Sequence, residues 1–144
     1  MIGWKYFTIN EMFRSNVAYT NNISNIPTDK TILNNIKDTL TELDRIRELF
    51  GNPIQITSGY RSPELNALVG GEPNSAHQYG FAADIISPKT TNRELFEFLK
   101  GMCLDGALEV DQLIWEKGTK TEPKWIHISF DKSRMRKQII YKKS

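Results

Sequence analysis

The chain has 144 residues, 39% of them hydrophobic and 25% charged, and a formal net charge of +2. This composition is ordinary for a soluble globular protein, so we expect one domain over residues 1–144, working as a monomer. No apolar run approaches the roughly 20 residues that span a bilayer, and the start lacks a basic leader, which argues against a transmembrane segment and a signal peptide. The charge is too mild to indicate nucleic-acid binding on its own.

Local patterns along the chain predict both helices and strands. In chain order, we expect helices at 8–17 and 29–50, a strand at 54–58, a helix at 63–69, a strand at 81–87, a helix at 91–102, strands at 112–116 and 125–130 that form a hairpin, and a last strand at 138–141. Two helices should begin at capping boxes, where Thr8 or Thr91 caps the amides and Glu11 or Glu94 reaches back. Because helices dominate early and closely spaced strands late, we predict an α+β fold with N-terminal helices packed on a small, mostly antiparallel sheet.

The end of the chain is basic. Residues 132–144 contain six lysines and arginines and no acidic residue. Such a run could attract an anionic polymer, but we favour a solvated terminal strand whose lysines protect its edge from pairing. A nucleic-acid binder is disfavoured, because aromatic residues are not interleaved with the basic run as single-strand binders require.

The two histidines of the chain are candidate metal ligands. His77 lies in an expected loop before a predicted strand, on which Asp84 shares a face with Ala82, whose small side chain leaves room for an ion. Pairing with the strand that carries His127 would bring Asp84 and His127 together. Two imidazoles and one carboxylate with an open fourth position describe a catalytic zinc site, whereas a closed structural site usually needs several cysteines. Alternatively, the histidines are ordinary core or surface residues, and Asp84 caps a turn or pairs with Arg61.

Three motifs occur in order along the chain. They are Ser58-Gly59-Tyr60-Arg61-Ser62-Pro63, Ser75-x-His77-x-x-Gly80-x-Ala82-x-Asp84 and Trp125-Ile126-His127. Together they resemble the zinc D-Ala-D-Ala carboxypeptidase family, which includes cell-wall endopeptidases of phages and vancomycin-resistance dipeptidases and shares its fold with hedgehog signalling domains. The resemblance runs from about residue 7 to residue 130 and looks most like the small phage and prophage branch.

The resemblance implies a zinc ion held by His77, Asp84 and His127, and cleavage of peptide bonds involving D-amino acids in peptidoglycan stem peptides. Such a site needs a base, because a proton must move from water to the leaving amine. Glu116 is the candidate, since it ends the strand expected to pair with that of His127 and hedgehog-like relatives carry a glutamate at a similar place in a hairpin. Glu122, five residues before His127, is the alternative.

Two residues just before His127 differ from those that the relatives often carry there. Lys124 and Trp125 stand near the last histidine where relatives often carry a base or another histidine, which leaves the choice of base open.

Arg61 resembles the family's arginine that faces the substrate carbonyl or its developing oxyanion; the alternative is an ion pair that closes its loop. Ser75 would bind substrate or, as we favour, fix the His77 loop. Tyr60 and Trp125 could wall the cleft or belong to the core.

We therefore predict a zinc metallopeptidase that acts on peptidoglycan, either a carboxypeptidase or an endopeptidase of the endolysin type. The competing hypothesis is a non-catalytic, zinc-stabilised structural or binding module of a phage virion or tail, with a phage structural protein as partner. Without a signal peptide, phage-mediated release, packaging in a virion and a bacterial cytoplasmic location fit equally well.

Overall fold

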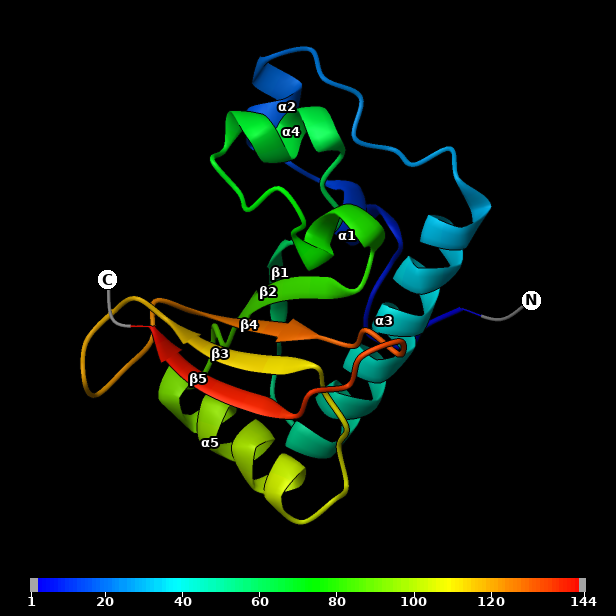
Figure 1. The fold of residues 1–144 in the computed structure, drawn as a ribbon. Coiled ribbons are helices and arrows are strands. Elements are labelled where there is room, and N and C mark those ends of the chain that lie inside the picture. Colours follow the sequence, from blue (N-terminus) through cyan, green and yellow to red (C-terminus); the bar gives the residue numbers. More distant parts are fainter. Residues whose placement is uncertain (1–2, 143–144) are drawn as a thin grey trace.

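The computed structural model describes residues 3–142 of the chain (Figure 1). In chain order the elements are α1 (Asn10–Phe13), α2 (Asn16–Thr20), α3 (Lys30–Phe50), β1 (Gln55–Ser58), α4 (Pro63–Leu68), the 3₁₀ helix η1 (Ala76–Tyr79), β2 (Ala82–Ile86), α5 (Asn92–Leu104), β3 (Gln112–Glu116), β4 (Trp125–Ser129) and β5 (Gln138–Lys142). All five predicted strands form, and the predicted α+β class is confirmed.

The longest helix, α3, has well-defined ends. The carboxylate of Asp29 accepts hydrogen bonds from the first free amides of the helix, those of Thr31 and Ile32, at 2.7 and 3.3 Å. Gly51 ends the helix in the left-handed region, with φ of 77°, where glycine carries no steric penalty. The helix predicted at 29–50 is therefore confirmed at both ends.

The helix predicted at 8–17 is wrong in its extent, because the chain forms two shorter helices there. Glu11 does reach back, accepting a hydrogen bond from the Thr8 amide at 2.6 Å, but the Thr8 side chain caps no helix amide. Ser15 has an extended backbone, and its hydroxyl accepts a hydrogen bond from the Ala18 amide at 3.1 Å. A serine that caps a new helix competes with continuation of the old one, so α1 ends and α2 begins.

The sheet has the strand order β1-β2-β4-β3-β5. The first three pairings, β1–β2, β2–β4 and β3–β4, are antiparallel, whereas β5 adds to β3 in parallel. The mostly antiparallel sheet and the β3–β4 hairpin were both predicted from the sequence. In Figure 1, α1, α2 and α4 gather near the β1 and β2 side of the sheet, and α5 lies near β3 and β5.

One face of the sheet forms the hydrophobic core with α3 and α5. The sheet residues of this core are Ile56, Ala83, Ile85, Leu113, Trp115, Ile126 and Ile128. Because successive side chains of a strand point to opposite faces, the residues between them lie on the other face. Asp84, His127 and Glu116 are among these, so burial of the apolar face also places the candidate site residues together.

The basic run at the end of the chain is only partly solvated. β5 forms as predicted, but Arg136 turns toward the buried carboxylate of Asp111, at 2.7 Å, and the half-exposed Arg134 lies 3.9 Å from it. Lys143 lies outside the described residues. Within residues 3–142, no helix combines the length and the apolar character needed to cross a membrane.

Candidate metal centre

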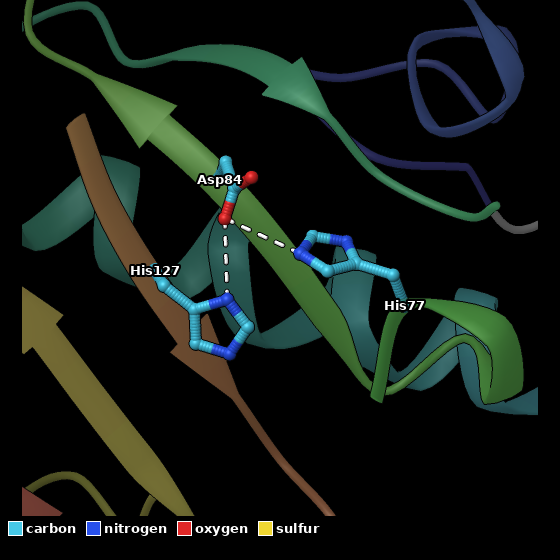
Figure 2. Close-up of side chains that lie close together, drawn as sticks. All are labelled: His77, Asp84 and His127. Carbon is cyan, nitrogen blue, oxygen red and sulfur yellow. Dashed lines mark hydrogen bonds and ion pairs between the residues drawn. The ribbon is translucent and has the colours of Figure 1, made fainter. Parts of the chain in front are cut away.

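The structure brings His77, Asp84 and His127 together (Figure 2). Antiparallel pairing of β2 with β4 places Asp84 directly opposite His127, as the alternation of the two strands predicted. Asp84 Oδ1 lies 3.3 Å from His77 Nε2 and 3.2 Å from His127 Nδ1. One donor atom from each residue lies within 4.8 Å of the others, and all three residues are buried.

His77 comes from η1, which is held tightly between Ser75 and Gly80. The Ser75 hydroxyl accepts a hydrogen bond from the His77 amide at 3.2 Å, which is the loop-fixing role expected for it. Gly80 has φ of 80°, and a Cβ there would lie 2.9 Å from the carbonyl oxygen of Ile32 and 2.7 Å from the side chain of Ile36. Only glycine fits this approach to α3, so the turn that aims His77 depends on it.

A backbone carbonyl fixes the tautomer of His77. Its Nδ1 lies 2.7 Å from the carbonyl oxygen of Gly59, which can only accept, so Nδ1 carries a hydrogen and Nε2 is the ring nitrogen that faces Asp84. Gly59 itself packs against α1, where a Cβ would meet the Met12 backbone at 2.7 Å. A histidine whose outer nitrogen donates to a carbonyl is the usual arrangement for a metal ligand.

Charge in the cluster suits a cation. Burial alone would raise the pKa of Asp84, but the neighbouring imidazoles of His77 and His127 and their hydrogen bonds hold that pKa well below its usual range. Asp84 is therefore an anion at neutral pH, facing two ring nitrogens across a buried gap. Two nitrogen donors and one oxygen donor, without sulfur, match the ligand set of catalytic zinc sites.

Arg61 lies beside this cluster and contacts Asp84 from the side away from the histidines. Its nitrogens face Ser58 Oγ at 3.4 Å, Asn66 Oδ1 at 3.2 Å and Asp84 Oδ2 at 3.5 Å. The ion pair weighed as an alternative is therefore present. A guanidinium has five N–H donors, so these three contacts leave one N–H on each terminal nitrogen. Arg61 also borders the cavity above the ligands, and it can orient Asp84 and face a ligand at once.

A cavity of about 250 Å³ opens above the three candidate ligands. Its lining residues are Arg61, Glu72, Asn74, Ser75, Ala76, His77, Asp84, Asp111, Gln112, Ile114, Glu116, Trp125, His127, Arg134 and Lys142. The volume is slightly below the roughly 300–1,000 Å³ of small-molecule sites, so it accommodates a short segment of an extended ligand. Larger hollows of about 590 and 900 Å³ lie away from the histidines.

The two glutamates considered as a base lie in different places. Glu116 pairs with Trp125 and borders the cavity, one diagonal step from His127, which corresponds to roughly 7 Å between diagonal residues of paired strands. Glu122 does not border it: its carboxylate accepts a hydrogen bond from the Asn92 amide at 2.7 Å, at the start of α5. The geometry therefore favours Glu116 and gives Glu122 a role in holding the helix.

The aromatic candidates also separate. Tyr60 is 6% exposed and belongs to the hydrophobic core, and it does not border the cavity, so its predicted contact with substrate finds no support in the structure. Trp125 does border the cavity, as one of its two predicted roles requires. Its indole nitrogen is buried and has no hydrogen-bond partner among the described residues.

Sequence reasoning missed four charged residues that border the cavity. Glu72, Asp111, Arg134 and Lys142 line it together with the predicted residues. Asp111 directly precedes a buried strand, which could have signalled a functional or paired carboxylate. No local pattern places Arg134 or Lys142 there, because their positions depend on the parallel addition of β5.

An α+β fold with two imidazoles and a carboxylate on the floor of a polar cavity defines a metal-binding domain with the ligand set of an enzyme. The sequence model of the peptidase M15 family matches residues 5–129, and the chain belongs to that family. Over 48 residues the chain is 44% identical to the zinc D-Ala-D-Ala carboxypeptidase of Streptomyces albus G. That match covers 33% of this chain and 19% of the relative's length, so the matched segment spans about a fifth of the relative. The predicted family is confirmed.

Proposed function

We propose that this chain is a zinc-dependent peptidase that hydrolyses peptide bonds in peptidoglycan stem peptides. The observation that carries the proposal is the buried cluster of His77, Asp84 and His127 below a cavity, in a member of the peptidase M15 family. The name of the Streptomyces relative supports a substrate that contains D-amino acids. The bond is either terminal, as in a carboxypeptidase, or internal, as in an endopeptidase.

The chain's own residues would hold the metal in a fixed position. His77 offers Nε2, His127 offers Nδ1 and Asp84 offers Oδ1, and each is anchored by backbone or strand pairing. Zinc, when bound, acts as a Lewis acid that polarises a carbonyl and makes water nucleophilic at neutral pH. All three residues border the cavity, so a substrate in the cavity would lie next to them.

Glu116 is the residue that would move the proton. It borders the cavity within one diagonal step of His127 and is partly exposed, so that its carboxylate can take a proton from water and pass it to the leaving amine. The amine side of the substrate would therefore lie toward the end of β3 that carries Glu116.

Arg61 would stabilise the negative charge that develops on the carbonyl oxygen. Its three hydrogen-bond partners fix the guanidinium, and the remaining N–H groups on its terminal nitrogens are available at the cavity. A donor that is already in place costs no reorganisation during reaction, which is the condition for effective electrostatic stabilisation. Contact with Asp84 links Arg61 to the ligand set, so its loss should affect turnover more than folding.

Metal analysis and peptidoglycan digestion test the proposal together. We expect protein purified without chelator to carry about one zinc per chain. We also expect it to release new amino groups from purified peptidoglycan, with activity removed by a chelator and restored by added zinc. Mass analysis of the fragments would identify the bond. Absence of metal would refute a zinc enzyme, whereas bound zinc without released amino groups would support the non-catalytic module.

A further inference from the structure

A second cluster of charged side chains borders the cavity where β3 begins. Asp111 is 1% exposed, and its carboxylate accepts hydrogen bonds from Arg136 Nε at 2.7 Å and Arg136 Nη2 at 2.9 Å. Burial alone would raise the pKa of Asp111, but these hydrogen bonds and the charge of Arg136 lower it below the usual range. Asp111 is thus an anion that Arg136 already neutralises.

This cluster holds Arg134 in place at its Nε and leaves the terminal nitrogens of its guanidinium available. Its Nε lies 3.3 Å from Asp131 Oδ2 and 3.9 Å from Asp111 Oδ2, and its side chain is 52% exposed. Within residues 3–142, the terminal nitrogens of Arg134 make no hydrogen bond to the protein, and the residue borders the cavity. A guanidinium held at Nε with free terminal nitrogens suits a carboxylate, which it can bind through two parallel hydrogen bonds.

The position of Arg134 indicates how a peptide substrate would be oriented in the cavity. β3 begins directly after Asp111 and ends at Glu116, and its middle residue, Ile114, pairs with His127. Arg134 is held at Asp111, so it lies on the opposite side of His127 from Glu116. If Glu116 protonates the leaving amine, the amine side of the bond faces Glu116 and the acyl side faces Arg134.

We propose that Arg134 binds a carboxylate of the substrate on the acyl side of the scissile bond. The inference rests on the proposed function, and it makes the preferred substrate a peptide with a free carboxylate N-terminal to the cut. Contacts with Asp131 and Asp111 hold Arg134 in place, which lowers the entropy lost on binding. Lys142 is the competing cation, since it pairs in register with Glu116 and borders the amine side, but it has no ion-pair partner among the described residues.

Two pairs of synthetic stem peptides test this assignment. The first pair carries either a free carboxylate or a carboxamide on the acyl side, and the second pair differs in the same way at the C-terminus, on the amine side. Cleavage efficiency, kcat/KM, is measured with zinc-loaded wild type, Arg134→Gln and Lys132→Gln. Lys132→Gln is the matched control, because it removes the same charge two residues away, where Lys132 contacts Asp38 at 3.2 Å outside the cavity.

We expect wild type and Lys132→Gln to prefer the acyl-side carboxylate by about tenfold, mainly through KM, as a charge-assisted pair at a half-exposed site allows. Arg134→Gln should lose that preference and cleave the carboxamide peptide as wild type does. An equal loss on both peptides would mean a structural role and would overturn the assignment. So would a preference for the amine-side carboxylate that disappears in Lys142→Gln.

Binding separates this inference from the proposed function. Calorimetric Kd values for the two acyl-side peptides are measured on zinc-loaded protein carrying Glu116→Gln, with and without Arg134→Gln. If wild type cleaves nothing but these Kd values show carboxylate selectivity that depends on Arg134, the catalytic proposal fails and the binding assignment stands. If wild type cleaves peptidoglycan and neither measurement shows such selectivity, the assignment fails and the catalytic proposal stands.

Discussion

The candidate site is assembled from two arms that are held in different ways. The first arm, residues 75–84, is fixed by close backbone contacts: Gly80 packs on α3, and the carbonyl of His77 accepts a hydrogen bond from the Arg61 amide at 3.1 Å. The second arm, residues 112–129, is a hairpin in which strand register places His127. Glu116 lies at the end of this hairpin, where solvent reaches it.

This difference separates two tasks. Close contacts give a metal ligand one allowed position, as a buried site requires. A strand end exposed to the cavity instead lets a carboxylate exchange protons. Removing the Glu116 carboxylate should therefore stop proton transfer and leave the metal bound, whereas loosening a contact that holds a ligand should weaken metal binding.

Asp84→Asn should produce the largest effect, because it alters the residue that joins the two arms. Asparagine keeps the size of the side chain but removes the charge that faces both imidazoles at 3.3 and 3.2 Å. We expect zinc content, measured by mass spectrometry after dialysis, to fall from about one per chain toward zero, and hydrolysis to disappear with it. Retention of stoichiometric zinc would show that Asp84 is no ligand.

Glu116→Gln should remove proton transfer by the second arm and leave metal binding unchanged. We expect zinc content to stay unchanged and turnover to fall by about 10²- to 10⁴-fold, the usual contribution of a general base. Glu122→Gln is the matched control, because its carboxylate binds the Asn92 amide outside the cavity, at 2.7 Å, and glutamine keeps that acceptor. If Glu122→Gln abolishes turnover while Glu116→Gln does not, the two roles are reversed.

Gly80→Ala should loosen the first arm without removing a ligand. A Cβ there meets Ile32 O at 2.9 Å and must also adopt φ of 80°, so we expect a loss of about 1–3 kcal/mol in unfolding free energy and weaker zinc binding. Gly101→Ala is the control, since nothing lies within 4 Å of a Cβ at that position in α5. Alanine in a helix should there raise stability, by up to about 1 kcal/mol. Equal stability changes in denaturant unfolding would contradict the packing role of Gly80.

The first arm was largely predictable from sequence, because its signals are local. Two histidines left little choice of nitrogen ligand, and alternation along the strands predicted that Asp84 and His127 share a face. The turn at Gly80 was visible as a break before a β-type run. The physical reason is that strand alternation and glycine turns are encoded within a few residues.

The second arm was harder to predict, because its details depend on distant contacts. Glu116 and Glu122 look alike in sequence, and the structure separates them, because Glu116 borders the cavity whereas Glu122 accepts a hydrogen bond from Asn92. The inward turn of the basic run to Asp111 spans 25 residues and leaves no periodic signal. The prediction of one helix at 8–17 was wrong for a local reason, because the Ser15 hydroxyl caps α2 and a new helix begins there.

Asp111→Asn should give the smallest effect, on the anchor of the second arm. Asp111 accepts hydrogen bonds from both the backbone and the side chain of Arg136, tying the start of β3 to the segment before β5. We expect the variant to lose about 1–3 kcal/mol in unfolding free energy at pH 7, the range for a buried hydrogen-bonding group that loses its partner. Urea titrations at several pH values would measure this gap in unfolding free energy between wild type and Asp111→Asn.

The pH dependence of that gap tests its electrostatic origin. The folded-state pKa of Asp111 is lowered, so its contribution is fully present above the unfolded-state pKa of about 3.9 and is lost as the pH falls through the folded value. The gap between wild type and Asp111→Asn should therefore be constant near neutrality and shrink below about pH 4. Asp38→Asn, which breaks the exposed pair with Lys132, should show no measurable gap at any pH. A gap for Asp111→Asn that stays unchanged in acid would mean that packing, and not the ion pair with Arg136, holds the hairpin arm in place.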